Sequence, residues 1–250
     1  MKLFWIRLLT LLTLLILSAC AAPGPLRVLF VGNSHTYGND VPDLVRRIAI
    51  TKGVQLEVEG ITAGGATLED HIKTGTVQQQ LEQGAFSAVV LQEQSGRQVL
   101  EVAKYEASAG KLAAFARARK TRVFIHMGWT RQDLVESSGY TQQNWTDSAL
   151  RVARATGAGV APVGEAWLAI KRRDPVLGLR LQDSDGNHAT LAGSYASAAT
   201  IFYALTGVSP LGAATKFASL PLPPADAAKL EQAAIDANLA LEPGFRQPFK

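Results

Sequence analysis

Short apolar runs alternate along the chain with longer segments of helical periodicity. Five segments have the apolar or alternating pattern of strands, namely residues 26–31, 54–61, 85–91, 122–127 and 159–163. Helices are predicted from apolar spacing, flanking signals or composition at residues 41–52, 67–73, 102–120, 148–156, 164–172, 190–205 and 226–241. An irregular stretch separates the helix ending near residue 172 from the one beginning near residue 190.

Strands that alternate with helices imply right-handed crossovers and a parallel sheet covered on both faces. We therefore expect an α/β fold, a flavodoxin-like three-layer α/β/α sandwich with a parallel five-stranded sheet, in which the first strand is central. In such sheets functional sites gather outside the carboxyl ends of the strands.

Composition limits both the architecture and the partners. A chain of 250 residues is long enough for one well-buried α/β domain, and 47% apolar against 18% charged residues is typical of a globular protein. The net charge is +4, but Lys2 and Arg7 lie in an apolar leader, and without them 23 basic residues face 21 acidic ones. Since basic residues do not cluster with aromatic ones, nucleic acid is not expected as a partner.

The N-terminus predicts export and a lipid anchor. Lys2 and Arg7 precede a short apolar core at residues 8–17, too short to favour a spanning helix over a signal peptide. The following Leu-Ser-Ala-Cys, ending at Cys20, resembles the bacterial lipobox, which implies that Cys20 carries the lipid; an ordinary cleaved signal is the alternative. We expect a signal peptide at residues 1–19, a tether at residues 20–25 and one domain at residues 26–250, lipid-anchored and extracytoplasmic in a bacterial envelope. Cys20 is the only cysteine, so the domain contains no internal disulfide.

A serine follows the first predicted strand directly. Ser34 lies two residues after the apolar run, at the edge of the sheet where a ligand has access, and nearby free N–H groups could face a developing negative charge. Taken alone, the segment favours a serine that merely caps the next helix. A dinucleotide loop is a further alternative, but the three-glycine pattern is missing.

One of the four histidines has an acidic residue at short spacing. Asp185 precedes His188 by three residues in a polar loop, which lets one turn hold the carboxylate against one imidazole nitrogen and leaves the other nitrogen for Ser34. Asp183 is a second possible orienting acid. The alternative role for His188 is a cap of the helix that follows it.

Three separated blocks together resemble the SGNH/GDSL hydrolase superfamily. Residues 32–36 (Gly-Asn-Ser-His-Thr) resemble its nucleophile block, with Asn33 and His35 in place of the commoner Asp and Leu. A glycine after the second strand and Asp-x-x-His at residues 185–188 resemble two further blocks, and residues 190–207 resemble the tail of a bacterial branch. The resemblance spans about residues 26 to 207. It implies a serine hydrolase with Ser34, Asp185 and His188 as its catalytic residues.

The resemblance also implies an oxyanion hole made by the N–H groups of Ser34 and of Gly64 or Gly65. The family usually supplies an Asn side chain from a Gly-x-Asn block after the third strand, whereas this chain has Leu-Gln-Glu-Gln-Ser at residues 91–95. A Gln amide offers the same kind of donor. Gln92 is nearer the strand end and is the expected donor, with Gln94 as the alternate.

Other candidate residues have simpler roles. We expect His126 to be a buried strand histidine with a satisfied partner, although it could line a pocket, and Trp129 and Trp145 to pack in the core, although they could form a sugar-stacking wall. Glu93 as an acid would need a second carboxylate at a defined distance, so a glycosidase has little support.

The predicted function is ester hydrolysis through an acyl-enzyme, without metal or cofactor. The exported address and the glutamine block favour acyl groups, such as acetyl esters, on carbohydrate, by analogy. The partners would be a small-molecule or carbohydrate ester and, through the N-terminal lipid, a membrane. The alternative is a non-catalytic carbohydrate-binding lipoprotein on a degenerate hydrolase scaffold.

Overall fold

The computed structural model describes residues 24–217 and 220–249. The predicted leader and Cys20 lie outside these residues. Within the described part of the chain, no helix combines the length and the apolar character needed to cross a bilayer.

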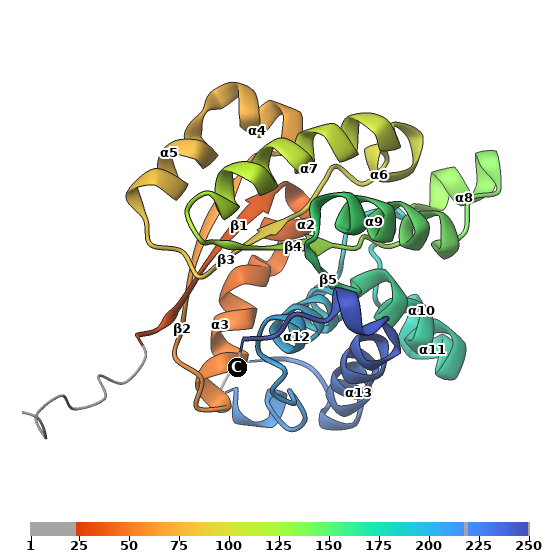
Figure 1. Ribbon diagram of the computed structural model, residues 1–250. Coiled ribbons are helices and arrows are strands. Elements are labelled where there is room, and N and C mark those ends of the chain that lie inside the picture. The colour runs from red at the N-terminus through yellow and green to blue at the C-terminus, as the bar shows by residue number, and fades with distance from the viewer. Residues whose placement is uncertain (1–23, 218–219, 250) are drawn as a thin grey trace, which may run out of the picture.

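A single sheet of five parallel strands forms the centre of the molecule (Figure 1). The strands are β1 (Leu26–Gly32), β2 (Leu56–Thr62), β3 (Ala88–Leu91), β4 (Arg122–His126) and β5 (Gly159–Ala161). Their order is β2-β1-β3-β4-β5, so β3 is the middle strand, and β1, which was expected to be central, lies beside it between β2 and β3. The chain reverses its direction of winding between β1 and β3, and a crevice at such a switch point is where sheets of this order bind ligands.

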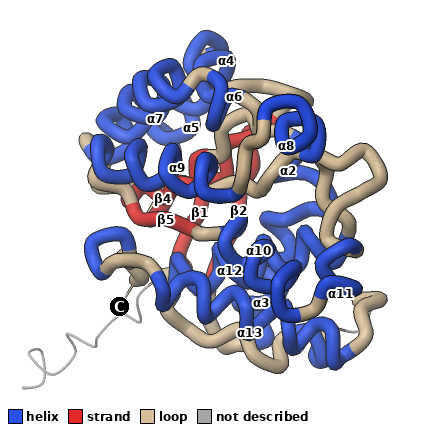
Figure 2. The backbone as a smooth tube through the Cα atoms, turned by 90° about the vertical axis from the view of Figure 1, so that its right-hand side faces the viewer, coloured by secondary structure: helices blue, strands red, loops and turns tan. Residues whose placement is uncertain are grey.

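Helices cover both faces of the sheet (Figure 2). One layer consists of α4 (Leu68–Thr74), α5 (Thr76–Gln83), α7 (Val102–Arg117) and α9 (Gln142–Thr156). The other consists of α3 (Val41–Thr51), α10 (Val163–Arg173), α12 (Leu191–Thr206) and α13 (Pro224–Ala240). The expected three-layer α/β/α sandwich is thereby confirmed.

Side chains that alternate along each strand supply the two cores. In β1, Val28 and Phe30 pack with α3 and α12, while Leu29 and Val31 pack with α4 and α7. All four are at most 1% exposed, which explains the unbroken apolar run in the sequence. This burial fixes the direction of β1 and therefore the position of the turn that follows it.

Short helices and turns complete the chain. The sequence pattern did not predict the short helices, which are α2 (Ser34–Tyr37), α6 (Arg97–Leu100), α8 (Gln132–Ser138) and α11 (Pro175–Leu179). The described residues also form three 3-10 turns, at Gly38–Asp40, Ala214–Lys216 and Pro243–Phe245. Helix α9 begins six residues before the predicted start, because Thr141 and Asn144 form a reciprocal capping box there.

Candidate active site

The turn between β1 and α2 presents Ser34 at the carboxyl edge of the sheet. Asn33 caps α2, and its Oδ1 accepts a 3.1 Å hydrogen bond from the N–H of His35. Gly32 has no room for a side chain, since a Cβ there would lie 2.4 Å from Oε1 of Gln92 and from Oγ1 of Thr36. The close packing of this turn leaves Ser34 partly exposed between two buried neighbours.

Ser34, His188 and Asp185 come together although Ser34 and His188 are 154 positions apart in the sequence. Nε2 of His188 lies 2.9 Å from Oγ of Ser34, and Nδ1 lies 2.5 Å from Oδ2 of Asp185. A proton on Nδ1 satisfies the carboxylate and leaves the Nε2 lone pair facing the serine hydroxyl. This arrangement allows His188 to remove the proton of Ser34 while Asp185 stabilises the resulting imidazolium.

Hydrogen bonds within the loop that carries Asp185 hold its conformation. Oδ1 of Asp185 accepts 2.9 Å hydrogen bonds from the N–H groups of Asn187 and His188. The hydrogen bond with the His188 ring, together with these N–H groups, lowers the pKa of Asp185 to about 2, so its carboxylate stays ionised at neutral pH. Asp183 instead accepts from the N–H of Ser184 at 2.7 Å, and the structure thus pairs His188 with Asp185.

A second turn lies beside Ser34, between β2 and α4. Nδ2 of Asn33 donates to the carbonyl of Ala66 at 2.9 Å, and the N–H of Ala63 donates to the carbonyl of Gly32 at 3.2 Å. These bonds hold the exposed Gly64 and Gly65 next to the turn that carries Ser34. Within the described residues, the N–H groups of Ser34, Gly64 and Gly65 have no acceptor, so they are available to an oxyanion.

The two glutamines after β3 face different partners. Gln92 is 1% exposed; its Oε1 accepts from the N–H of Asn33 at 2.8 Å, and its Nε2 donates to the carbonyl of Glu93 at 2.5 Å. Gln94 is partly exposed, and its Oε1 accepts a 2.8 Å hydrogen bond from the N–H of Arg97. Its Nε2 has no acceptor among the described residues.

Comparison with known proteins identifies the family. No protein-family model and no curated protein match the chain. Among solved structures, a protein of Slackia heliotrinireducens assigned to the SGNH hydrolases is 26% identical, with a TM-score of 0.61 over 72% of this chain and 98% of that one. The chain belongs to the SGNH/GDSL hydrolase superfamily.

Two further structures share the SGNH fold at lower identity. A DUF4886 family protein from Bacteroides uniformis is 20% identical, with a TM-score of 0.74 over 86% of this chain and 95% of that one. An acetyl xylan esterase is 15% identical, with a TM-score of 0.60 over 72% of this chain and 99% of that one. The SGNH assignment makes the protein a hydrolase.

The expectation that Gln92 serves as the third oxyanion donor of this SGNH site is not supported by the geometry. Both polar ends of its amide are bound inside the protein, and the side chain is inaccessible. Gln94, the alternate, combines a fixed carbonyl with a free and accessible NH₂ group. The direction of the chain at the carboxyl end of β3 decides between the two glutamines, because it turns the side chain of Gln92 into the interior and leaves that of Gln94 partly exposed.

The aromatic candidates are buried around the SGNH site. Trp129 and Trp145 are at most 1% exposed and donate their indole N–H groups to the carbonyls of Asn187 and Ser95, so both are packing residues, as expected, and neither forms a sugar-stacking wall. His126 is buried as expected, but neither ring nitrogen has a partner in the described structure, and the expected satisfied partner is wrong.

Two residues near the site were not singled out from the sequence. Tyr37, one helical turn after Ser34, is 48% exposed, and its hydroxyl lies 3.4 Å from where a Cβ of Gly64 would be. Asn187 lies inside the Asp185–His188 block, and its side-chain oxygen contacts Nε2 of His35 at 3.1 Å. Its position directly before His188 is the feature of the sequence that could have marked it as a site residue.

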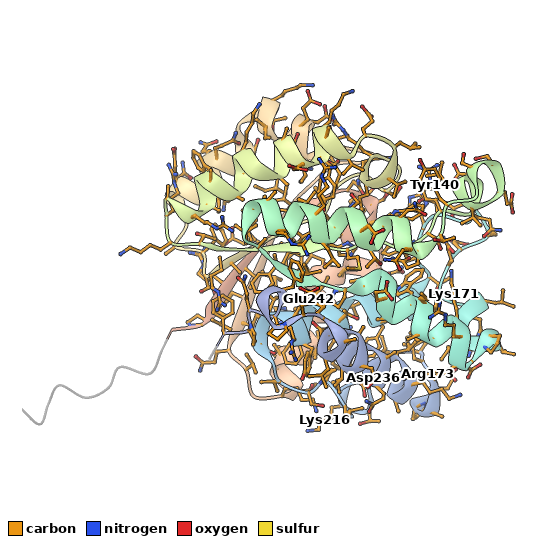
Figure 3. All side chains as sticks on the ribbon, turned by 45° about the vertical axis from the view of Figure 1, so that its right-hand side comes forward. Tyr140, Lys171, Arg173, Lys216, Asp236 and Glu242 are labelled. Atoms are coloured by element: carbon orange, nitrogen blue, oxygen red, sulfur yellow. The ribbon has the colours of Figure 1, made fainter. Side chains whose placement is uncertain are left out.

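The site is open to solvent on the side of His188 and Asp185. The side chains of His188 and Asp185 are 44% and 47% exposed. A cavity of about 520 Å³ borders the same loop, and Lys171 of α10, which is labelled in Figure 3, is one of its lining residues. Among the described residues, no three His, Cys, Asp or Glu side chains are arranged to hold a metal ion.

Proposed function

We propose that the protein is a serine esterase that cleaves ester bonds through an acyl-enzyme, with Ser34 as nucleophile, His188 as general base and acid, and Asp185 as the group that orients His188. The observation that carries this proposal is the continuous pair of hydrogen bonds from Ser34 Oγ to His188 Nε2 and from His188 Nδ1 to Asp185 Oδ2. A serine hydroxyl becomes an effective nucleophile when such a base removes its proton.

The reaction follows from the geometry in two halves. Oγ of Ser34 attacks the ester carbonyl carbon while its proton passes to Nε2 of His188, and the tetrahedral intermediate collapses as His188 returns that proton to the leaving alcohol. Water then attacks the acyl-enzyme, again losing a proton to His188. Ser34 recovers the proton, and the acyl group leaves as a carboxylic acid.

The oxyanion of each tetrahedral intermediate needs donors that are already in place. We assign this role to the N–H groups of Ser34 and of Gly64 or Gly65 and to the side-chain NH₂ of Gln94. All of these groups lack an acceptor among the described residues, so they need not give up an existing bond when the charge develops.

We propose acyl groups on carbohydrate, acetyl above all, as the substrate. A partly exposed Ser34 beside a half-exposed His188 suits a small acyl group on a bulky alcohol that stays largely in solvent. The cavity beside the loop offers the carboxylate of Asp183 and the ammonium of Lys171 to the hydroxyl groups of such an alcohol. The acetyl xylan esterase of the same fold is in keeping with this class.

The test combines substrate profiling with labelling of Ser34. Acetylated sugars and short acyl esters are offered to the wild type, to Ser34→Ala and to Ser137→Ala, a control that changes an exposed serine of α8. A fluorophosphonate should modify the wild type and the control at Ser34 but not Ser34→Ala. Turnover that survives in folded Ser34→Ala would refute the proposal, and binding of acetylated sugar without any turnover would favour the carbohydrate-binding alternative.

We also propose that the protein is held in the bacterial envelope, outside the cytoplasm, by a lipid on Cys20. The support is the apolar leader and the lipobox-like residues before the only cysteine. One acyl chain anchors a protein only weakly, so stable attachment requires more than one. Cys20→Ala should therefore move the protein from the membrane fraction to the soluble fraction; a variant that stays in the membrane with its leader cleaved would exclude this anchor.

A further inference from the structure

Two neighbouring contacts join the nucleophile turn to the loop of the general base. Oγ of Ser34 lies 2.9 Å from Nε2 of His188. The residue after Ser34 contacts the residue before His188, since Nε2 of His35 lies 3.1 Å from Oδ1 of Asn187. Of these two contacts, only the one between Ser34 and His188 involves residues that take part in the proposed reaction. The second connects the same two segments one residue away on each side.

A column of stacked rings holds His35 in place. The imidazole is 3% exposed and stacks on Trp129 with centroids 4.2 Å apart and planes 9° apart, and Trp129 stacks on Trp167 at 4.2 Å and 11°. The edge of the same imidazole faces the ring of His188, with centroids 5.8 Å apart. Trp129 also donates its indole N–H to the carbonyl of Asn187 at 2.9 Å. One rigid column therefore contacts both segments.

Asn187 is the point at which three segments meet. Its Oδ1 accepts from His35 and, at 3.2 Å, from the hydroxyl of Ser95 in the loop after β3. Its N–H donates to Asp185, whose carboxylate also holds His188. A displacement of Asn187 is thereby transmitted directly to the residues on either side of it.

His35 is suited to be a neutral donor. Burial, followed by the nearby His126, lowers the pKa of His35 to about 3, so its ring is uncharged at neutral pH. With the proton on Nε2, the ring donates to Asn187 and leaves only the lone pair of Nδ1 without a partner. The other tautomer would bury an unpaired N–H, which is the costlier arrangement.

We propose that His35 is a positioning residue, whose Nε2–H, through Asn187, holds the Asp185–His188 loop at the distance from Ser34 that proton transfer needs. This role rests on the proposed esterase function and adds a group to it. His35 does not touch the reacting atoms. Its contribution is the geometry of the Ser34–His188 contact, for which a misplacement of about 1 Å can cost roughly a hundred-fold in rate.

Two substitutions at one position separate the hydrogen bond from the packing. His35→Phe keeps a ring on Trp129 but removes the donor, whereas His35→Gln loses the ring but carries an amide nitrogen in place of Nε2. Asn187→Ala removes the acceptor at a partly exposed loop position outside the hydrophobic core. His126→Phe is the matched control, because His126 is a buried imidazole edge-on to the same Trp129 with no hydrogen-bond partner among the described residues.

The readouts are kcat and KM on an ester that the wild type hydrolyses, and the rate at which a fluorophosphonate labels Ser34. We expect His35→Phe and Asn187→Ala each to lower kcat and the labelling rate about ten- to a hundred-fold, with KM changed less than about three-fold. His35→Gln should recover most of the loss, and His126→Phe should match the wild type. The double variant His35→Phe/Asn187→Ala should be little worse than Asn187→Ala alone, because that variant already lacks both the bond with His35 and the bond with Ser95.

The outcomes are distinguishable. Equal activity of His35→Phe and His35→Gln, or losses that multiply in the double variant, would overturn the positioning role while leaving the esterase assignment intact. If His35→Phe does not fold, wild-type activity of Asn187→Ala overturns the role by itself. A wild type that is never labelled at Ser34 would overturn the proposed function, and this inference with it.

Discussion

The side-chain oxygen of Gln92 lies 2.8 Å from the backbone nitrogen of Asn33, the residue immediately before the proposed nucleophile. The same oxygen accepts a 2.9 Å hydrogen bond from the hydroxyl of Thr36, two residues after that nucleophile. Gln92 thus supports the Ser34 turn from behind, within the interior of the protein. The glutamine expected at the reacting atoms is instead part of the scaffold beneath them.

The first prediction separates the roles of the two glutamines. Gln94→Ala should lower kcat about a hundred- to a thousand-fold with little change in KM, the size found for the loss of one oxyanion donor. Gln92→Ala should lower the free energy of unfolding by about 2 kcal/mol or more, because it leaves the buried N–H of Asn33 and the hydroxyl of Thr36 without an acceptor. Ester kinetics and urea unfolding of both variants provide the measurements.

The stability measurement also serves as the control for Gln94. Its side chain lies in a partly exposed loop, so Gln94→Ala should unfold at nearly the same urea concentration as the wild type. A Gln94→Ala variant with wild-type kcat would leave the oxyanion hole to the backbone N–H groups of Ser34 and the Gly64–Gly65 turn.

The second prediction concerns Glu93, a carboxyl group buried under the site. Its Oε1 accepts from the N–H groups of Leu68 and Gln94, at 3.2 and 2.7 Å, while Oε2 has no partner among the described residues. Burial raises the pKa of Glu93 from 4.5 to about 7. The folded state therefore binds this proton more tightly than the unfolded chain, and the stabilisation, complete below about pH 4.5, is lost as pH rises through 7.

Glu93→Gln keeps an acceptor for both N–H groups and removes the titration. Between pH 4 and pH 8, the free energy of unfolding of the wild type should fall relative to that of Glu93→Gln, by an amount on the order of 3 kcal/mol. Urea unfolding of both proteins across this range gives the difference, in which the other titrating groups cancel. Parallel pH curves for the two proteins would mean that Glu93 titrates normally.

Much of the fold follows from the sequence because burial leaves a strong pattern. Strands β1, β3 and β4 are covered on both faces, so their residues form short apolar runs that cannot be solvent-facing. The short helices α2 and α8 show no such apolar pattern in the sequence. The first is a single turn fixed by the Asn33 cap, and the second has no buried residue. The apolar pattern therefore cannot reveal them, because one is too short to show a period and the other has no buried face.

In the candidate site too, some relationships between residues follow from the sequence and others require the structure. The pairing of Asp185 with His188 follows from their spacing, since three residues form one turn. The choice between Gln92 and Gln94 depends on which way the chain leaves β3, which residue type does not reveal. The contact of His35 with Asn187 spans 152 positions and required the structure.

The third prediction tests close packing of α12 against its neighbours. Gly193 lies in this helix, and a Cβ there would meet the carbonyl oxygen of Leu181 at 2.1 Å and the ring of Trp167 at 2.6 Å. Gly193→Ala should therefore lower the free energy of unfolding by about 1 to 3 kcal/mol or more. The matched control is Gly110→Ala in α7, where a Cβ meets nothing within 4 Å, and where alanine should raise stability by about 1 kcal/mol. Equal effects of the two substitutions would show that α12 can shift to make room.

The fourth prediction is that Ser34, His188 and Asp185 act as one unit. Ser34→Ala and His188→Ala should each remove most esterase activity, and the double variant should be scarcely worse than either, because the second substitution has little left to remove. Asp185→Asn should also be severe, since an amide can hold the wrong tautomer of His188, with its proton on Nε2 facing Ser34.

The measurements are kcat/KM for the three single variants and the Ser34→Ala/His188→Ala double variant, with unfolding curves for each. All four should remain folded, because the three side chains are partly or fully exposed and contribute no buried core contact. Independent contributions would instead multiply, so that the loss in the double variant equals the product of the two single losses. That result would mean that His188 does not activate Ser34, even though the two side chains lie within hydrogen-bond distance.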